Sequence, residues 1–312
     1  MSRGADNDRW FFPDGSLAGD DLDLVIDDHS DGWQHTGQLN VTLAPGESIT
    51  RDLGDWEAMI LPLAGAATVA VEGQTYELAG RPDVFAGPAD VLYAPRGSTV
   101  TVTGAALTGN DEAGNDGGLP SRIAICLAHD PESDGRAKPP VAHLPASEVP
   151  VELRGAGNAT RQVRNFGVPG VLEANRMIAV EVITPAGNWS SWPPHKHDTT
   201  RPGVESELEE IYYYETQATD ERGVDPIGYQ RVYGTEDRPI DVLAEVRTGD
   251  VVLVPHGWHG PAIAAPNADL YYLNVMAGPG PERSWLICDD PAHGWVREAW
   301  PELPIDPRLA DE

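Results

Sequence analysis

Two histidines separated by a single residue are the first sign of chemistry in this sequence. His195 and His197 lie in the stretch PPHKHDTT, among prolines and turn-forming residues. On an extended strand, residues i and i+2 point to the same face. The two imidazole rings are therefore predicted to point at one position, as two ligands of a metal ion would.

A glutamate-rich segment downstream offers a carboxylate for the same position. If ELEEIYYYE (207–215) is a strand, Glu210 shares one face with Leu208 and Tyr212. Glu210 is therefore the predicted inward carboxylate. The other three glutamates have the opposite parity, which predicts a solvated face: Glu205, Glu207 and Glu209.

A third histidine should come from GDVVLVPHGWHGP (249–261). His259 begins the strand predicted after the turn, whereas His256 lies inside the Pro-His-Gly turn. We prefer His259 as the ligand and keep His256 as the alternative. Three imidazoles and one carboxylate would hold one divalent transition metal and leave positions open for substrate or water. Zinc or manganese is expected first, with iron and nickel as alternatives. The competing interpretation is a set of scattered surface histidines.

The elements that must position these residues are predicted to be strands. Short β-rich runs such as MILPLAG, ATVAVEG, DVVLVP and DLYYLNVMAG are separated by turn residues, with 33 glycines and 28 prolines in the chain. No long segment has a convincing 3.6-residue period, and no run of 18 apolar residues occurs. The pattern is typical of an all-β protein built from antiparallel sandwiches or barrels.

The two halves of the chain resemble each other. Residues 87–104 parallel residues 247–264, and residues 55–65 parallel residues 207–217. This repeat predicts two copies of one β domain, over 1–145 and 146–312, with a linker near 131–150. The first copy has Ala58 in place of Glu210 and RGST in place of HGWH. We therefore expect a metal-free, structural first domain and a metal site in the second.

Charge and cysteine content narrow the function classes. The net charge of −29 repels nucleic acid and anionic membranes, so neither is expected as a partner. Cys126 and Cys288 are expected to be inert thiols in a cytoplasmic protein. The loop 108–122 is polar and glycine-rich and is expected at the surface.

The order of the predicted ligands resembles the cupin signature, in which an HxH pair, a glutamate and a final histidine follow one another. Glu210 comes later after the HxH pair than is usual, which indicates an inserted loop, and His259 comes one residue early. Longer motifs sharpen the resemblance. RWFFPDGS, WPPHKHD, LEEIYYY, QRVYG, DLYYLNVMAGP and WLICDDPAHGWVR are together similar to the 5-deoxy-glucuronate isomerase family, over residues 10–295.

This resemblance implies a bicupin fold and an aldose–ketose isomerase. The reaction it implies converts 5-deoxy-D-glucuronate to 2-deoxy-5-keto-D-gluconate in myo-inositol catabolism. The related 5-keto-4-deoxyuronate isomerases of pectin breakdown use the same C-terminal metal cluster. The expected binding partners are a sugar-acid substrate and further copies of the same chain. A cupin dioxygenase that uses Fe(II) and a non-catalytic sugar-binding cupin are the alternatives.

The chemistry requires more than the metal ligands. A base must carry a proton between C1 and C2 of the sugar through an enediol, unless a hydride shift replaces it. Tyr214, Lys196 and Tyr272 are the candidates, and the sequence does not choose among them. Arg231 in QRVYG is the candidate for the substrate carboxylate, although a surface arginine paired with an acid is an equal interpretation.

Overall fold

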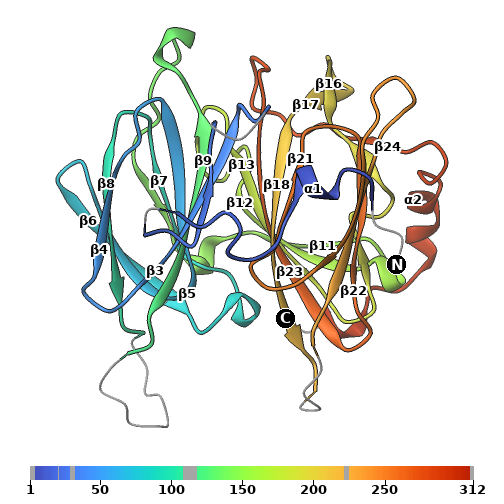
Figure 1. Cartoon of the computed structure of the whole chain (residues 1–312), viewed down its shortest axis with the longest axis horizontal. Coiled ribbons are helices and arrows are strands. Elements are labelled where there is room, and N and C mark those ends of the chain that lie inside the picture. The colour runs from blue at the N-terminus through green and yellow to red at the C-terminus, as the bar shows by residue number, and fades with distance from the viewer. Residues whose placement is uncertain (1–3, 20, 29–31, 108–117, 221–224, 310–312) are drawn as a thin grey trace. The chain divides into compact units, whose positions relative to one another are not determined.

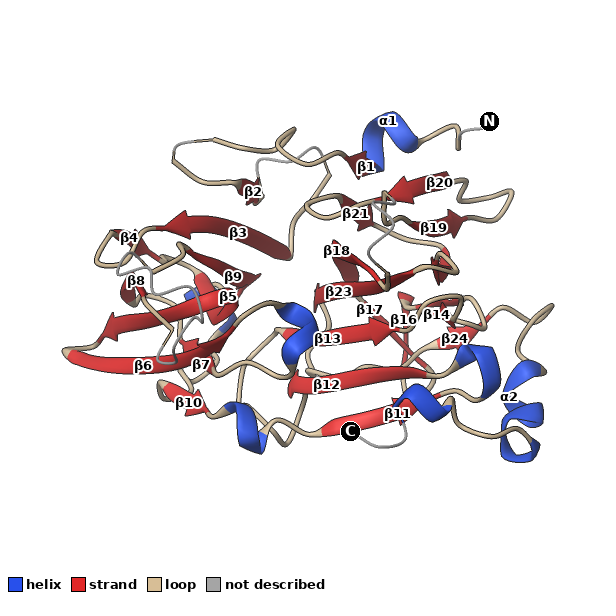
Figure 2. Cartoon of the chain, turned by 90° about the horizontal axis from the view of Figure 1, so that it is seen from below, coloured by secondary structure: helices blue, strands red, loops and turns tan. Residues whose placement is uncertain are grey.

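The structure is a computed structural model that describes residues 4–19, 21–28, 32–107, 118–220 and 225–309. Most of its regular secondary structure is in strands, and its helices are short (Figure 2). It divides into two compact units, which are described separately. The C-terminal unit comprises residues 1–16, 151–165 and 180–312, and the N-terminal unit comprises residues 17–150 and 166–179. Most of the loop expected at 108–122 lies outside the described residues.

A single cut after residue 145 therefore does not describe the two units. The first residues of the chain belong to the C-terminal unit, because β1 (Phe11–Phe12) pairs with β21 (Val251–Val254). Asp6 also donates its backbone N–H to the Asp241 carbonyl at 2.9 Å. The stretch expected to be a linker carries a strand of its own, since β10 (Ala142–Leu144) pairs with β7 (Val91–Ala94).

The N-terminal unit is built around one long strand, β5 (Trp56–Val71). The first half of β5 pairs with β7 and β9, and its second half pairs with β6 and β8. Register shifts lie between these halves, where Gly65 has a φ of +78° and a Cβ would lie within 3 Å of Ser121. The remaining strands are β2 (Leu24–Ile26), β3 (Thr36–Leu43), β4 (Ser48–Asp52), β6 (Gln74–Arg81), β8 (Thr99–Ala105) and β9 (Ser121–His129).

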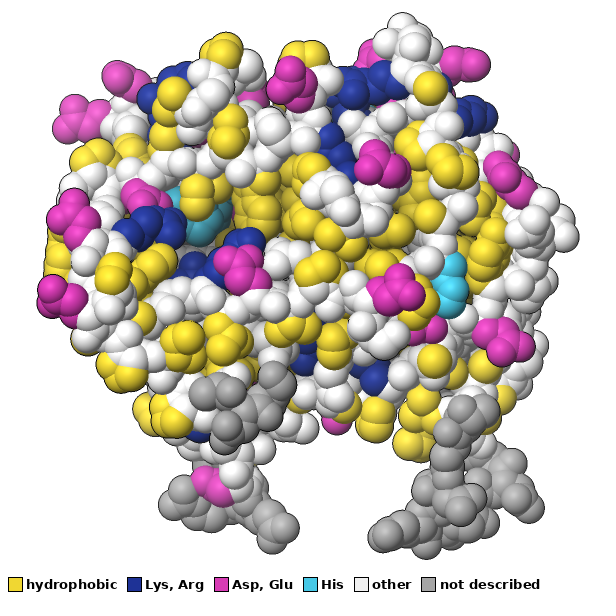
Figure 3. All heavy atoms as spheres, turned by 180° about the vertical axis from the view of Figure 1, so that it is seen from behind, with side chains coloured by type: hydrophobic (Ala, Val, Ile, Leu, Met, Phe, Trp, Pro, Cys, Tyr) yellow, Lys and Arg dark blue, Asp and Glu magenta, His cyan; other side chains and the backbone are white. Residues whose placement is uncertain are grey.

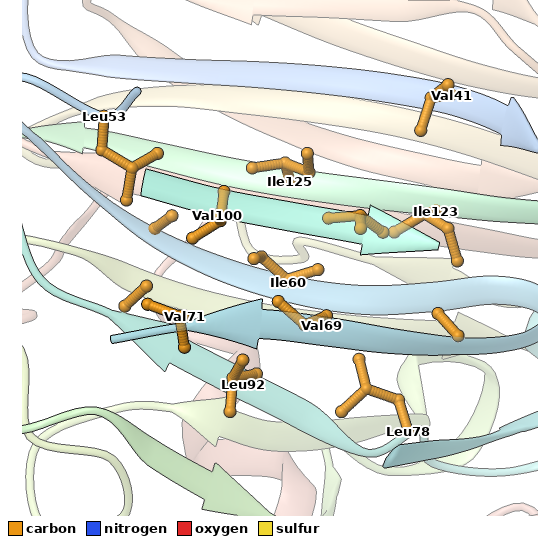
Figure 4. Close-up of a cluster of buried hydrophobic side chains, with 14 of the residues drawn as sticks. Val41, Leu53, Ile60, Val69, Val71, Leu78, Leu92, Val100, Ile123 and Ile125 are labelled. Atoms are coloured by element: carbon orange, nitrogen blue, oxygen red, sulfur yellow. The ribbon is translucent and has the colours of Figure 1, made fainter. Parts of the chain in front are cut away.

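Apolar side chains from both halves of β5 pack into one core. Ile60 from the first half and Val69 from the second are fully buried, together with Leu92, Val100 and Ile125 from neighbouring strands (Figure 4). Burial of such side chains is the main stabilising contribution to a β-sandwich. This unit therefore has a hydrophobic core of its own.

The C-terminal unit has two main antiparallel sheets and a small hairpin (Figure 1). One sheet has the order β1-β21-β18-β23-β13-β12-β11, and the other has the order β20-β19-β22-β15-β24, with β14 beside β22. The strands not yet bounded are β11 (Val151–Arg154), β12 (Arg161–Gly167), β13 (Ile178–Thr184), β14 (Trp189–Ser190), β15 (His195–Lys196), β16 (Asp198–Arg201), β17 (Glu205–Glu207), β18 (Glu209–Ala218), β19 (Gly228–Tyr233), β20 (Asp241–Val246), β22 (Trp258–Ala264), β23 (Ala268–Ala277) and β24 (Cys288–Asp289). The α-helices are α1 (Asn7–Trp10) and α2 (Val296–Ala299).

The internal repeat appears in the strand register of the two units. Ala58 pairs with Ala94 between β5 and β7, and Glu210 pairs with Val254 between β18 and β21. The sequence alignment matches Ala58 to Glu210 and Ala94 to Val254, so the equivalent residues are also equivalent partners. The prediction of two copies of one β domain is thus reflected residue by residue in the ladders.

Residue Glu57, beside Ala58, has a different task in the N-terminal unit. Its buried carboxylate accepts hydrogen bonds from the backbone N–H groups of Asn175, Arg176 and Met177 at 2.7–2.8 Å. It also accepts one from the Tyr93 hydroxyl at 2.8 Å. These bonds attach residues 166–179 to the N-terminal unit.

We expect Glu57→Ala to destabilise the protein strongly. It leaves buried donors without an acceptor, and each costs about 1–3 kcal/mol, so the loss should be about 3 kcal/mol or more. Thermal and urea unfolding of the full chain would measure it. Glu77→Ala, at an exposed position on β6, is the matched control and should change stability by less than about 0.5 kcal/mol. Equal effects of the two substitutions would contradict this account.

Candidate metal centre and substrate cavity

Four side chains from strands and turns of the C-terminal unit gather at one place. His195 on β15 and His259 on β22 are direct cross-strand partners, and His197 follows His195 by two residues. Glu210 comes from β18 in the other sheet. All four are buried, with exposed fractions between 1% and 8%. The fold thus brings together residues that the sequence places up to 64 positions apart.

Three of the four form a tight group. The Glu210 Oε2 atom lies 3.0 Å from His197 Nε2 and 3.1 Å from His259 Nε2. One ligand atom from each of these residues lies within 4.8 Å of the others. His195 stands beside them, with its ring centroid 4.6 Å from that of His259 and 6.3 Å from that of His197. Its role as a fourth ligand stays a prediction.

Backbone carbonyls orient the three imidazoles in the same way. The Nδ1 atoms of His195, His197 and His259 lie 3.2–3.3 Å from the carbonyl oxygens of Pro193, Leu208 and Gly257. A carbonyl only accepts, so Nδ1 carries the proton in each contact. In a neutral ring, Nε2 then keeps its lone pair. This is the arrangement by which proteins present histidine to a metal.

The charges of the group follow from burial and from its members. Burial lowers the pKa of His195 well below its usual value, and the neighbouring charges of His259 and His197 lower it further. This ring is therefore neutral. Burial alone would raise the pKa of Glu210, but His259 and His197 outweigh that effect and lower it to about 2. The carboxylate is therefore an anion.

These residues fit a divalent transition metal. Within the described part of the chain, His259 Nε2 is buried and makes no hydrogen bond of good geometry, although Glu210 Oε2 is close. An unsatisfied imidazole nitrogen directed at a carboxylate and a second imidazole matches the donor set that such ions prefer. Zinc, manganese, iron and nickel would all accept these donors.

The residues that the sequence weighed as alternatives lie elsewhere. His256 directs its Nε2 toward the Pro239 carbonyl at 3.3 Å, away from the group of three. Glu209 is buried but does not belong to that group. The preference for Glu210 and His259 over Glu209 and His256 agrees with this geometry.

The predicted solvated glutamate face is wrong for two of its three members. Glu205 and Glu209 are both buried. The prediction assumed one continuous strand, but Glu205 lies on β17, which forms a separate hairpin with β16. There, Glu205 accepts hydrogen bonds from Lys196 and Arg201.

A cavity of about 600 Å³ adjoins the histidine–glutamate group. His195 and Glu210 line it together with Tyr212, Tyr272 and Asn274. Ser191, which follows β14, also lines it. The remaining lining residues come from β11 and the turn after it, β12, β13 and the C-terminal segment, and include Arg154, Arg161, Trp285, Arg297 and Trp300. Figure 3 shows a hollow on one face in which histidine, Lys or Arg, and hydrophobic side chains meet. The volume suits a small polar ligand.

Of the three candidate bases, only Tyr272 lines this cavity. Its hydroxyl donates to Ser190 Oγ at 2.9 Å and lies 3.4 Å from Ser191 Oγ. The Tyr214 hydroxyl donates to Gln230 Oε1 at 2.8 Å, and Tyr214 does not line the cavity. Burial raises the pKa of both phenols, so both are protonated at neutral pH.

Lys196 does not line the cavity. Its ammonium group donates to Asp198 at 2.5 Å and to Glu205 at 2.6 Å. Burial would lower the pKa of Lys196, but these two carboxylates outweigh it and raise the pKa. Lys196 is therefore a fixed cation and not a free base.

Arg231 is likewise absent from the cavity lining. Its Nη1 donates to Asp241 at 2.5 Å and to the carbonyls of Val232 and Val242. The surface interpretation of this arginine is the correct one, because its side chain points along the β19–β20 ladder. Sequence reasoning also missed Tyr212 as a cavity residue, although the parity argument had placed it on the face of Glu210.

The fold and the site define a class. Two β-sandwich units, one of which holds a buried histidine–glutamate group, make the protein a bicupin, and the expected all-β fold is confirmed. The model of the KduI/IolB family matches residues 12–296, and the chain belongs to that family. No helix among the described residues is long and apolar enough to span a membrane.

Named relatives cover most of the chain. It is 41% identical to a 5-deoxy-glucuronate isomerase from Geobacillus kaustophilus (strain HTA426), over 86% of this chain and 88% of that protein. The protein of the same name from Bacillus subtilis (strain 168) is 37% identical, over 82% of this chain and 85% of that protein.

Solved structures agree with the assignment. The crystal structure of an IolB-like protein from Salmonella typhimurium LT2 matches with a TM-score of 0.78 and 32% identity, over 92% of this chain and 99% of that one. Oxalate decarboxylase from Lactobacillus farciminis matches with a TM-score of 0.58 and 11% identity, over 90% and 88%. At that identity, the second match shows the fold alone.

We expect His259→Ala to lose the bound metal and His256→Ala to keep it. His259 contributes a nitrogen to the buried group, whereas His256 faces Pro239. Elemental analysis of both purified variants and of the unsubstituted chain would measure metal per chain. The fold should persist in both, because the sheets bury a core that does not depend on an ion. Circular dichroism checks this. Full metal content in His259→Ala would contradict the assigned group.

Proposed function

We propose that this chain is an aldose–ketose isomerase that converts 5-deoxy-D-glucuronate to 2-deoxy-5-keto-D-gluconate, a step of myo-inositol catabolism in the cytoplasm. One divalent metal per chain, held by His195, His197, Glu210 and His259, would assist it. The observation that carries the proposal is the buried histidine–glutamate group adjoining a polar cavity, in a chain of the KduI/IolB family. The names of the relatives support the substrate.

The reaction sets clear demands on the site. C2 loses its hydrogen as a proton, and C1 gains a proton. The hydroxyl oxygen on C2 also loses its proton and becomes a carbonyl oxygen, while the aldehyde oxygen on C1 gains a proton and becomes a hydroxyl. A bound divalent ion would polarise the two substrate oxygens and make the C2 hydrogen more acidic. The chain itself must hold the sugar, exclude water and manage the oxygen-bound protons.

Tyr272 is the residue that we propose for the transfer of those protons. Its phenol is protonated, lines the cavity and is hydrogen-bonded to Ser190. Ser190 in turn accepts from the Thr184 hydroxyl at 2.8 Å and donates to the Ala262 carbonyl at 3.3 Å. We infer that Tyr272 Oη donates a proton to the substrate oxygen that becomes a hydroxyl and recovers one from the other oxygen. Ser191, which lies near Tyr212 and Tyr272, helps to fix the phenol.

Isomerisation in D₂O would show how the carbon-bound hydrogen moves from C2 to C1. Proton transfer through an enediol would place deuterium on the CH₂OH carbon of the product, which derives from C1 of the substrate, and NMR would detect it. A hydride shift would leave this carbon free of solvent deuterium. Failure of the metal-loaded protein to produce the ketose at all would contradict the proposed function.

The two alternative functions have tests of their own. An oxygen electrode would detect the O₂ consumption of a dioxygenase, which an isomerase does not show. Sugar that stays unchanged with metal present would identify a binding module.

The N-terminal unit is proposed to have a structural role without metal. Ala58 occupies the place that corresponds to Glu210, and an alanine offers no ligand atom. Packing and self-association are its proposed tasks. Two metals per chain, with one located in this unit, would contradict the proposal.

We expect Tyr272→Phe to lower kcat by about 10²–10⁴, the range typical of a lost general acid or base. KM and metal content should change little, because the ring and the metal ligands remain. Tyr214→Phe is the matched control: it removes a hydroxyl from an equally buried tyrosine that does not reach the cavity. It should keep kcat within about fivefold. Steady-state kinetics with metal analysis would compare them, and similar losses in both variants would exclude Tyr272 from this role.

A further inference from the structure

Three arginines line the cavity, and they differ in their partners. Arg154 donates its Nε to Glu152 at 2.9 Å. Arg297 donates to both oxygens of Asp289, at 2.5 and 2.7 Å. Arg161 is 7% exposed, and among the described residues it makes no ion pair with a carboxylate. Its hydrogen bond runs from Nη1 to the Ala159 carbonyl at 3.2 Å, and the Trp300 ring lies 5.6 Å away.

A buried guanidinium in this condition is unusual. Buried charges in proteins are normally paired with an opposite charge, because their desolvation is otherwise uncompensated. Arg161 stays charged at neutral pH, since burial lowers its pKa only to about 10. One neutral carbonyl and one aromatic ring leave several N–H donors of the guanidinium free for another group.

Two features of the backbone build this position. Arg161 and Arg154 are direct partners in the β11–β12 ladder, so like charges stand opposite each other, which is unfavourable without an anion between or near them. Gly155 is in the left-handed region with a φ of +79°, and a Cβ there would lie 2.1 Å from the Ala159 carbonyl oxygen and 2.8 Å from Arg161 Nη1. Glycine at this turn therefore lets the backbone pass close to the Ala159 carbonyl that accepts from Arg161.

We propose that Arg161 binds the carboxylate of the sugar-acid substrate, which deepens the proposed function and rests on it. The guanidinium presents paired donors that match a carboxylate. Because Arg161 lines the same cavity as Glu210 and His195, the carboxylate end of the sugar lies against β12 and its carbonyl end lies at the histidine–glutamate group. Arg161 thus replaces Arg231 in this role and selects sugar acids over neutral sugars.

The experiment uses the metal-loaded full chain with D-glucuronate and D-glucose as a charged and a neutral probe. Isothermal titration or ligand-induced thermal shift would measure their binding, and kinetics would follow 5-deoxy-glucuronate. The unsubstituted protein should bind glucuronate at least tenfold more tightly than glucose. Arg161→Met should weaken glucuronate binding and raise KM by about 10–100-fold, the loss expected for hydrogen bonds to a charged group. Glucose binding and metal content should stay the same.

Two further variants sharpen the result. Arg161→Lys keeps the charge without the paired donors and should fall between the unsubstituted protein and Arg161→Met. Arg231→Met, in which the removed arginine lies outside the cavity lining and already has Asp241 as its partner, should change glucuronate binding by less than about fivefold. If Arg161→Met does not fold, the probe preference of the unsubstituted protein and the Arg161→Lys variant still test the proposal.

The outcomes separate this inference from the proposed function. No preference for glucuronate over glucose in the unsubstituted protein, or an unchanged preference in Arg161→Met, would overturn the role of Arg161 even if isomerisation is observed. A glucuronate preference that depends on Arg161 would support the role even if 5-deoxy-glucuronate is not isomerised. In that case the proposed function alone would fail.

Discussion

The contact between the Glu210 carboxylate and the imidazoles of His197 and His259 is the constraint on which the geometry of the candidate site depends. A buried anion is tolerated only where partners compensate its lost hydration. Here the partners come from β22 and from the chain after β15, while Glu210 comes from β18 in the other sheet. The two sheets must therefore be held in register around this contact. Cross-strand pairing of His195 with His259 and the carbonyls behind the rings of His197 and His259 keep these two imidazoles directed at Glu210.

The equivalent strand of the N-terminal unit, β5, has no glutamate at the position of Glu210. Ala58 and Glu210 occupy equivalent positions in the ladders, and both are buried. The preceding residue is a buried glutamate in both units, Glu57 and Glu209. In the N-terminal unit, Glu57 serves the backbone of residues 175–177, so an acid at this parity stabilises the fold. One step along the strand directs the side chain to the opposite face, where Glu210 meets the histidines. A change of parity thus separates the structural acid Glu57 from the proposed metal ligand Glu210.

Local pattern predicted much of this arrangement. The HxH spacing, the parity of Glu210 and the internal repeat depend on neighbouring residues and on strand geometry, so they could be recognised without a fold. The prediction for Glu205 failed because the chain leaves the strand at Leu208, and the β16–β17 hairpin buries this acid against Lys196 and Arg201. The position of Arg161 in the cavity could not be predicted from the sequence. Every residue of β12 is buried, so no alternation of polar and apolar residues indicates which side chains face inward. The exchange of segments between units depends on contacts such as those of Asp6 and Asp241, which are distant in sequence.

The acidity of the chain and its proposed anionic substrate are compatible for a physical reason. The net charge of −29 acts mainly between solvent-exposed groups, whose fields are screened over about 8 Å at physiological ionic strength. Inside a cavity walled by buried side chains, the nearest charges dominate, and there the chain places three arginines. Two of them are neutralised by Glu152 and Asp289, so their main effect is on shape and packing. The remaining positive charge is that of Arg161. The proposed selectivity of the site for an acid therefore rests on which arginine lacks a carboxylate partner, and not on the charge of the molecule as a whole.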